Sequence, residues 1–478
     1  MNFAVELEKN PLFRILQQAA QKVNVPAYVI GGYVRDMILG RPSKDVDVVC
    51  VGSGIALAKT FAECLDQPAQ VNVFKNFGTA MVKTDSFEVE FVGARKESYD
   101  RNSRKPIVED GTLEDDQNRR DFTINAMAFS LQKENFGELI DPFGGLEDIK
   151  RRLIKTPLEP GITYSDDPLR MMRAVRFAAQ LNFDIDHDSF IAIQEQKERI
   201  KIVSGERIID EFNKIVLSKK PSYGFKLLYH CGLLEIIFPE FTALQGVEKV
   251  NGKTHKDNFY HTLQVLDNIS ENTDDLWLRW SAIMHDIAKP ATKRFDKKQG
   301  WTFHGHEDKG ARMVKPIFRR MKLPLDERMR VVEKLVKLHL RPIALVKDSI
   351  SDSAIRRLLF EAGDDLEGLM MLCRADITSK NHQRVQKYLA NFNKLEKKIA
   401  DVEARDQIRN FQPVITGEII METFGVKPSK VVGDIKIKIR EAILEGELKN
   451  NYDEAYQFML KAGKELGLKE VSESNDSE

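Results

Sequence analysis

The sequence contains little cysteine, no net charge and no long apolar run. Its four cysteines are scattered over 478 residues and form no C-x-x-C pair, which argues against a disulfide framework. The 73 basic and 73 acidic residues cancel, so any basic surface for a polyanion must be local. No apolar stretch approaches the roughly 18 residues that a membrane span needs.

The first 23 residues include the acids Glu6 and Glu8 and predict an amphipathic helix rather than a signal peptide. Together with the cysteine pattern, this favours a cytoplasmic protein without membrane contact. The chain is too long for one ordinary core, which predicts roughly two to four domains. The sequence does not indicate an oligomeric state.

The distribution of apolar residues predicts an α+β fold. Short strand-like runs mix with helical stretches over about the first 150 residues, and from about residue 163 only helical spacing remains. We expect a head with a small, mixed, five-stranded sheet, an all-α neck, a helical body after the polar segment 246–258, and a helical tail. The expected ranges are 1–155 for the head, 156–245 for the neck, 255–395 for the body, 396–470 for the tail and 471–478 for a disordered end.

The stretch VIGGYVRDMILGRPSKDVDVV combines a glycine pair with two acids in a strand. Because side chains alternate along a strand, Asp45 and Asp47 project from one face about 7 Å apart. Neighbouring buried carboxylates need a multivalent cation, and Mg²⁺ prefers such ligands together with substrate phosphates. Gly31 and Gly32 allow close backbone approach to a triphosphate, which Arg35 can also reach. The stretch therefore predicts a magnesium site for phosphoryl transfer.

A third carboxylate is expected on a neighbouring strand. The segment FEVEFVGAR offers Glu88 and Glu90, which alternate with apolar residues, and Glu90 is the preferred candidate. A surface turn followed by an edge strand with solvated acids would explain an isolated D-x-D pair. The ordered glycines, arginine and later strand acid favour the catalytic interpretation.

Five ordered segments resemble one enzyme family. GGYVRD, KDVDVV, RRDFTINAMAF, DPFGGLEDIKRRLIKT and DDPLRMMRAVRFAA are similar to the head and neck of the class II tRNA nucleotidyltransferase and poly(A) polymerase family. The resemblance covers about the first 240 residues. It implies a polymerase-β-type nucleotidyltransferase that adds nucleotides to an RNA 3′ end without a nucleic-acid template.

The resemblance also implies a set of nucleotide-binding residues. Asp167 and Arg170 match the family's base-reading pair, whose acceptors and donors fit the Watson–Crick edge of C or A. Asp166 stands where the family often has Glu, which keeps the charge. Arg173 and Arg176 suit phosphate contact, although an isolated arginine stripe is usually a solvated face. The residues expected to hold triphosphate and ribose are Arg119, Arg120, Asp121 and Asn125.

Residues 95–118 are polar and show little apolar periodicity, which predicts a mobile loop beside the site. In the resembling family a flexible loop here accompanies the switch from C to A addition, which argues against an enzyme that stops after CC. Arg101 and Arg104 are candidates for this movement. A merely tolerant surface loop is an equal alternative.

A second group of potential metal ligands follows downstream. Six of the nine histidines lie between residues 255 and 339, and a His-Asp pair occurs on an apolar helix. This pattern resembles the HD phosphohydrolase superfamily, which implies a divalent metal such as Mn, Ni, Fe or Mg. A helical body that has lost its metal is the alternative. The implied ligands are His261, His285, Asp286 and Asp376, with His306 and His339 as further candidates.

The segment 415–450 alternates glycine turns with lysine-bearing helices and resembles the C-terminal region of the same family. A local basic face there would neutralise tRNA phosphates, and a solvated helix face is the alternative. The candidate RNA contacts are Lys427, Lys430, Lys436, Lys438 and Arg440.

Together these patterns favour an enzyme that builds or repairs the tRNA 3′ CCA end from CTP and ATP with Mg²⁺. A poly(A) polymerase or an A-adding tRNA nucleotidyltransferase would share the fold. A hypothesis of another class is an HD metal-dependent phosphohydrolase with an RNA-binding head. In related nucleotidyltransferases the HD domain hydrolyses phosphomonoesters and 2′,3′-cyclic phosphates.

Overall fold

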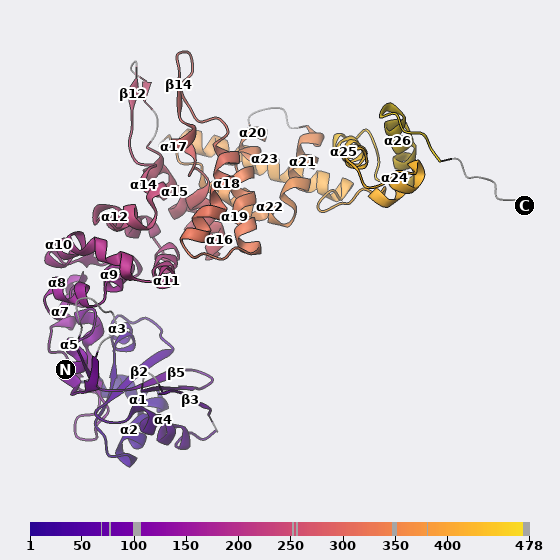
Figure 1. Ribbon diagram of the computed structural model, residues 1–478. Helices are drawn as coiled ribbons and strands as arrows, with labels where there is room; N and C mark the ends of the chain where they lie inside the picture. Colours follow the sequence, from indigo (N-terminus) through magenta and orange to yellow (C-terminus); the bar gives the residue numbers. More distant parts are fainter. Residues whose placement is uncertain are drawn as a thin grey trace, which may run out of the picture. The chain divides into compact units, whose positions relative to one another are not determined.

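The computed structural model describes residues 1–67, 69–75, 78–98, 107–250, 253–254, 257–346, 351–379 and 381–471. The chain divides into two compact units, Met1–Thr242 and Ala243–Glu478. The first contains a large sheet and the second is mostly helical, which confirms the predicted α+β class (Figure 1). Among these residues, no helix combines the length and apolar character needed to cross a membrane.

The sheet of the first unit has seven strands, so the predicted five-stranded sheet is wrong. The outermost strands on one side have only three and two residues, too few to show an alternating pattern. In spatial order the strands are β3 (Val71–Phe74), β4 (Thr79–Lys83), β5 (Glu88–Gly93), β2 (Asp45–Cys50), β1 (Ala27–Ile30), β8 (Ala128–Ser130) and β9 (Leu139–Ile140).

The two faces of the central strands differ because side chains alternate. On β2, Val46 and Val48 are buried. On β5, Phe91 packs its ring 5.3 Å from Phe61 of α4 (Gly54–Glu63), which covers this side of the sheet (Figure 1). The opposite face is therefore left for the acidic residues of β2 and β5.

Helices form most of the remainder of the first unit. α9 carries an apolar stripe that is buried against α11 and α12. The helices are α1 (Ala4–Glu8), α2 (Pro11–Lys22), α3 (Gly32–Ile38), α5 (Leu113–Asn118), α6 (Thr123–Ala126), α7 (Gly145–Arg151), α8 (Pro160–Asp166), α9 (Leu169–Leu181), α10 (His187–Gln196), α11 (Gly205–Val216), α12 (Pro221–His230), α13 (Leu233–Ile237) and α14 (Pro239–Thr242), with a 3₁₀ helix, η2 (Lys197–Ile202).

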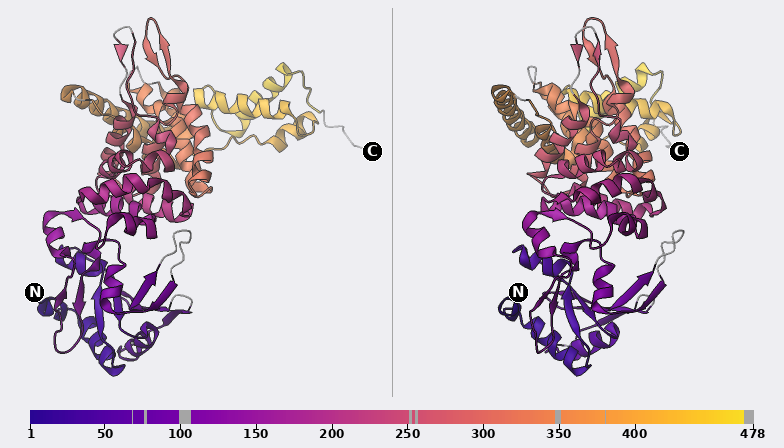
Figure 2. Two further views of the ribbon diagram at one scale, coloured as in Figure 1. Left: turned by 60° about the vertical axis from the view of Figure 1, so that its left-hand side comes forward. Right: turned by 90° about the vertical axis from the view of Figure 1, so that its left-hand side faces the viewer.

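The loop predicted at residues 95–118 is wrong for most of its length. β6 (Arg95–Ser98) pairs antiparallel with β7 (Ile107–Asp110), and the hairpin extends away from the large sheet (Figure 2). Helix α5 follows, and it begins with a capping box in which Thr112 and Asp115 exchange hydrogen bonds. The strands are rich in charged residues, so they lack the apolar alternation that would reveal them. Arg101 and Arg104 lie outside the described residues.

The prediction that strands end near residue 163 is also wrong. Among the described residues five short strands follow, each of two or three residues, and their length again hides them from the sequence pattern. They are β11 (Asp184–Ile185), which pairs with β10 (Leu153–Ile154), and the hairpins β12 (Lys249–Val250) with β13 (Lys253–Thr254) and β14 (Arg294–Asp296) with β15 (Gly300–Thr302).

The second unit is built on packed helices. The core contains the buried Trp280 of α16, whose ring lies 5.8 Å from that of Phe318 on α18. The helices are α15 (Asn258–Ser270), α16 (Leu276–Met284), α17 (Lys289–Thr292), α18 (His306–Arg320), α19 (Glu327–Leu338), α20 (Leu340–Leu345), α21 (Asp352–Ala362), α22 (Leu366–Ala375), α23 (His382–Asp406), α24 (Gly417–Phe424), α25 (Lys430–Glu445) and α26 (Tyr452–Glu465), with a 3₁₀ helix, η3 (Gly363–Asp365).

Candidate active sites

The first unit contains a cavity of about 760 Å³, here called the head cavity, which residues of the head and of the predicted neck line together and into which most of the predicted nucleotide-site residues project. Its walls come from β2, β5, the turn before α3, the α5–α6 segment, α9 and α11. The predicted residues that line it are Gly31, Gly32, Arg35, Asp45, Asp47, Glu90, Arg120, Asp121, Asn125, Arg173 and Arg176.

The strand register brings the acidic residues together. In the parallel pair β2–β5, Asp47 lies opposite Glu90 and Asp45 lies opposite Glu88. Glu88 forms an ion pair with Lys83 on β4, which already neutralises it. Both glutamates line the cavity, and the register favours Glu90 as the third carboxylate because it pairs with the more buried of the two aspartates.

Burial raises the pKa of Asp47, and the nearby Asp45 and Asp116 raise it further against the opposing effect of Arg120 and Arg173. Burial and the charge of Asp47 likewise raise the pKa of Glu90. The shift has burial as its first cause, and the repulsion of Asp47 by Asp45 and of Glu90 by Asp47 adds to it. A divalent cation bound to the oxygens of Asp45 and Asp47 would relieve that repulsion, so the donor set fits Mg²⁺.

Gly31 allows the close approach of the groups around the acids. Its φ is +84°, and a Cβ there would lie 2.9 Å from Nη1 of Arg120 and 3.1 Å from Oδ2 of Asp47. Any side chain would therefore be strained and would displace two site residues. This packing gives a physical reason for the glycine before α3.

Polar side chains of the same cavity hold the guanidinium groups of Arg35 and Arg173 in place. Arg35 donates to Oδ1 of Asn125 at 2.7 Å, and Arg173 lies 2.6 Å from Oδ2 of Asp121. Burial favours a higher pKa for Asp121, but Arg173 and Asn125 dominate and lower it to about 2. Asp121 is therefore an ionised anchor for the arginine rather than a free ligand.

Phe177 is a site residue that the sequence analysis missed. The central guanidinium carbons of Arg35, Arg173 and Arg176 lie 4.9, 5.3 and 4.1 Å from the centre of its ring. Arg176 is also 3.1 Å from the buried Glu211 on α11. In the segment RAVRFAAQLNF an aromatic residue at helical spacing indicates core packing. The sequence therefore does not distinguish a phenylalanine that packs against arginines of the site from an ordinary core phenylalanine.

The predicted base-reading residues lie apart from this cavity. Arg170 donates to the backbone carbonyl of Arg119 at 2.5 Å, and both line a second cavity of about 250 Å³. Asp167 lies 3.2 Å from Arg207 on α11, and its Oδ1 accepts a hydrogen bond from the backbone of Leu169 at 3.2 Å. Within the first unit, the arginines expected to bind phosphate thus lie in one cavity, and Asp167 and Arg170 lie outside it.

In the second unit, the six predicted HD residues form one cluster. Two groups of ligand atoms, each within 4.8 Å, share Asp286: one adds His261 and His285, and the other adds His306 and His339. Asp376 joins through its Oδ1, which lies 2.9 Å from Nε2 of His261. His306 and His339 thus lie beside the other predicted ligands.

The backbone orients three of these imidazoles toward the cluster. The Nδ1 atoms of His285, His306 and His339 lie 2.7, 2.8 and 2.6 Å from backbone carbonyl oxygens. Their Nε2 atoms are buried: those of His285 and His306 lie 3.2 and 3.3 Å from carboxylate oxygens of Asp286, and that of His339 has no hydrogen-bond partner within the described part of the chain. Burial also lowers the pKa of His339 to about 4, which keeps that ring neutral. Inward-facing imidazole nitrogens beside carboxylates fit a divalent transition metal.

Two neighbours of the cluster were not predicted. Lys289 donates to Oδ2 of Asp286 at 2.6 Å, and the hydroxyl of Thr378 lies 2.9 Å from Nδ1 of His261. Lys289 follows Asp286 by three residues, across the turn between α16 and α17, so their closeness in sequence could have indicated this contact. Thr378 belongs to the segment after α22, and its contact with His261 depends on tertiary packing.

The candidate RNA contacts of the tail do not share one free basic face. Lys438 forms an ion pair with Glu465 at 2.9 Å, and Arg440 forms one with Glu441 at 3.1 Å. Lys427, Lys430 and Lys436 are exposed. Of the predicted tail end, residues 472–478 lie outside the described residues.

Three family descriptions match consecutive parts of the chain. The "Poly A polymerase head domain" matches residues 27–155, the "Probable RNA and SrmB- binding site of polymerase A" matches 182–245, and the "HD domain" matches 258–380. A CCA-adding enzyme of Lactobacillus delbrueckii subsp. bulgaricus is 30% identical over 442 residues, covering 92% of this chain and 94% of the relative. The chain belongs to the class II tRNA nucleotidyltransferase and poly(A) polymerase family.

Relatives in this family are named both for CCA addition and for A addition. An A-adding tRNA nucleotidyltransferase of Deinococcus radiodurans is 31% identical over 347 residues, which cover 70% of this chain and 76% of the relative. A solved structure described as a CCA-adding enzyme with ATP shares the fold, with a TM-score of 0.64, 19% identity and coverage of 98% of this chain and 99% of that one. Membership of the family therefore leaves the added nucleotides open.

Proposed function

We propose that this protein is a template-independent nucleotidyltransferase that builds or repairs the tRNA 3′ CCA end from CTP and ATP. The similarity to a CCA-adding enzyme over 92% of the chain is the observation that carries this choice over A addition. The A-adding relative is similar over a smaller part, 70% of the chain. Poly(A) synthesis is the remaining alternative within the family.

The residues of the head suit this chemistry. Asp45 and Asp47 would hold Mg²⁺, which when bound lowers the pKa of the RNA 3′ hydroxyl and supports the leaving pyrophosphate. In the reaction the 3′ oxygen forms a bond to the α-phosphorus of the nucleotide while the bond to pyrophosphate breaks. Arg35 and Arg173, held by Asn125 and Asp121, would bind the triphosphate.

Two further features of the head support the proposal. The cavity of about 760 Å³ lies in the size range of small-molecule sites. Glu90 lies opposite Asp47 in the strand register and supplies the third carboxylate. Asp167 and Arg170 are assigned to base choice by the family resemblance, with Arg119 beside them.

The decisive experiment supplies labelled CTP and ATP, separately and together, to three RNAs. A tRNA that ends before CCA should accept C from CTP alone and CCA from the mixture, and a tRNA that ends in CC should accept A. Incorporation of A only, with no C on the first RNA, would favour an A-adding enzyme. Long A tracts on an unrelated RNA would favour a poly(A) polymerase.

We also propose that the second unit is a metal-dependent phosphohydrolase. The imidazole nitrogens that converge on Asp286 favour this second function, because two groups of ligand atoms that share this carboxylate each lie within 4.8 Å of one another. The metal would be held by His261, His285, Asp286 and Asp376, with His306 and His339 beside them, and when bound it would activate water. Water adds to phosphorus, the ester P–O bond breaks and the alcohol leaves with a proton. One such step would free an RNA 3′ end that carries a phosphomonoester, and two would free an end that carries a 2′,3′-cyclic phosphate.

Hydrolysis can be tested with β-glycerophosphate and 2′,3′-cyclic AMP in the presence of Mn²⁺, Ni²⁺ or Mg²⁺ in turn. Release of phosphate or opening of the ring with at least one metal is the expected result. A protein that binds none of these metals and hydrolyses neither compound would instead make the body a helical scaffold.

A further inference from the structure

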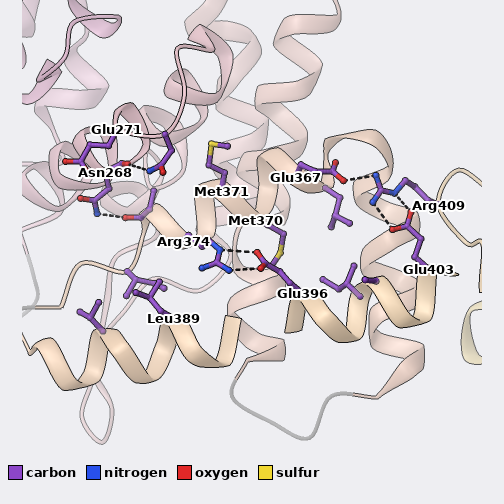
Figure 3. A pocket seen from close by; sticks show the side chains of 17 residues that line it. Asn268, Glu271, Glu367, Met370, Met371, Arg374, Leu389, Glu396, Glu403 and Arg409 are labelled. Atoms are coloured by element: carbon purple, nitrogen blue, oxygen red, sulfur yellow. Dashed lines mark hydrogen bonds and ion pairs between the residues drawn. The ribbon is translucent and has the colours of Figure 1, made fainter. Parts of the chain in front are cut away.

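Two cavities of the second unit lie along α22 and α23, and they differ in the state of their arginines. The larger has a volume of about 710 Å³ and contains Arg374 and Arg409. Glu396 accepts two hydrogen bonds from Arg374, and Glu367 and Glu403 bind Arg409, so both cations are neutralised (Figure 3). This cavity offers no unpaired arginine to an anionic ligand.

The smaller cavity, of about 290 Å³, adjoins the histidine cluster. His261 and Asp376 form part of its wall, so a ligand inside it reaches the proposed metal ligands. Arg384, on the first turn of α23, also lines it, and its guanidinium has no ion-pair or hydrogen-bond partner within the described residues. An exposed, unpaired arginine is well suited to bind a phosphate with two N–H groups.

Aromatic side chains complete the same wall. Tyr388 is one turn after Arg384 on α23, and Phe392 follows after another turn. Phe392 is buried, and the central guanidinium carbon of Arg374 lies 5.9 Å from the centre of its ring. Tyr388 is only partly buried and therefore presents apolar surface to a ligand in the cavity.

We propose that this cavity binds the nucleoside portion of a nucleotide whose terminal phosphate lies at the histidine cluster. Tyr388 would stack on the base, and Arg384 would bind a phosphate oxygen. The volume is close to the lower limit of ordinary ligand sites, so one nucleotide fits and a longer segment must extend into solvent. The inference rests on the proposed hydrolase function and makes its substrate a nucleotide rather than any small phosphoester.

The ligand chemistry is a ribonucleoside with a 3′-phosphate or a 2′,3′-cyclic phosphate. Such a group occurs in a free mononucleotide and at the end of a damaged RNA. An exposed Arg384 at the rim is compatible with either source. Assays with 3′-AMP and with a short RNA that ends in a 3′-phosphate distinguish the two.

The test compares Arg384→Gln and Tyr388→Leu with the control Lys387→Gln in the full chain. Lys387 is an exposed cation on the same helix that does not line the cavity, so its loss controls for general electrostatics. Calorimetry measures binding of 3′-AMP and of the RNA with the metal that supports the most hydrolysis, or with Mn²⁺ if none does. We expect each cavity variant to weaken binding about tenfold, which corresponds to about 1.4 kcal/mol, and the control to bind like wild type.

Any nucleotide that binds to the head gives the same signal in all four proteins, so the difference reports on the second unit alone. Hydrolysis supplies an independent readout: KM for 2′,3′-cyclic AMP should rise about tenfold in both variants, with KM for β-glycerophosphate changed less than about twofold for Tyr388→Leu. Normal binding of both ligands by the variants, or no binding by wild type, would overturn the cavity assignment. Binding that depends on Arg384 and Tyr388 without any hydrolysis would support the cavity and reject the hydrolase.

Discussion

The head cavity and the histidine cluster both bury carboxylates, but they surround them differently. Burial raises the pKa of Asp47, and the other acids of the cavity keep it raised. For Asp286, His285 and Lys289 outweigh burial and lower the pKa well below its usual range. In the head cavity, acids and arginines thus lie together without lowering the pKa of Asp47, while in the cluster His285 and Lys289 already balance the charge of Asp286.

The surrounding cations explain what each region can bind. Several guanidinium groups face the head cavity, where they match the charges of a triphosphate. Around the cluster, imidazole nitrogens replace them, and imidazole suits a transition metal better than a phosphate chain. The head cavity is therefore suited to a polyanion bound together with a metal ion. The histidine cluster is suited to a metal ion that acts on a small substrate.

Replacing Asp47 should have the largest effect, and it should affect the head site and not the histidine cluster. Asp47→Ala should lower nucleotide incorporation by on the order of 10³-fold or more, because charge stabilisation in the transition state is lost. Hydrolysis of 2′,3′-cyclic AMP should stay at the wild-type rate. Asp85→Ala, which removes an exposed acid from the turn between β4 and β5, is the matched control. Near-normal incorporation by a folded Asp47→Ala protein would reject the metal assignment.

The converse change is Asp286→Asn, which preserves the shape of a fully buried side chain. It should abolish hydrolysis and remove the bound Mn²⁺ or Ni²⁺ that metal analysis finds after dialysis, because both ligand groups share this carboxylate. Incorporation of CTP and ATP should change less than about twofold, since the sites belong to different units and should act independently. A well-folded variant that loses nucleotide addition would contradict the two-site interpretation.

Arg170→Ala tests base choice, with an intermediate effect. If Arg170 reads the Watson–Crick edge, discrimination against UTP and GTP should fall by about 1–3 kcal/mol, or roughly 5- to 150-fold, in incorporation assays with all four nucleotides. The hydrogen bond to the carbonyl of Arg119 offers a structural alternative. In that case all nucleotides would lose activity equally, and Asp167→Asn would leave selectivity intact.

Sequence patterns predicted the parts of both sites that depend on local spacing. Alternation along β2 correctly placed Asp45 and Asp47 on the open face, and the His-Asp pair indicated the cluster. The choice between Glu88 and Glu90 has further support from the register of two strands far apart in sequence. Strands of two or three residues and charged hairpins were missed because they contain no apolar period.

Contacts made through tertiary packing were also beyond the sequence patterns. The separation of Arg170 from the arginines of the main cavity depends on which way each side chain leaves α9. Thr378 reaches His261 across 117 residues of chain. Such contacts depend on how helices pack, which periodicity within one helix does not specify.

The smallest expected effect concerns Phe177, whose ring lies among three guanidinium groups of the head. Phe177→Leu keeps an apolar side chain but removes the ring face, so the arginines should lose about 1 kcal/mol of orientation energy. We expect KM for CTP and ATP to rise about fivefold with little change in kcat, and the increase to shrink at high salt. Hydrolysis by the second unit should stay unchanged.

Phe61→Leu is the matched control for Phe177, because Phe61 is equally an aromatic core residue of the first unit but packs on Phe91 and not on an arginine. Both substitutions should lower the melting temperature by similar amounts, since each replaces a buried ring with a smaller apolar group. Only Phe177→Leu should change KM for the nucleotides. If the two variants have the same KM, the ring of Phe177 contributes packing alone, and the arginines are positioned by Asp121, Asn125 and Glu211 without it.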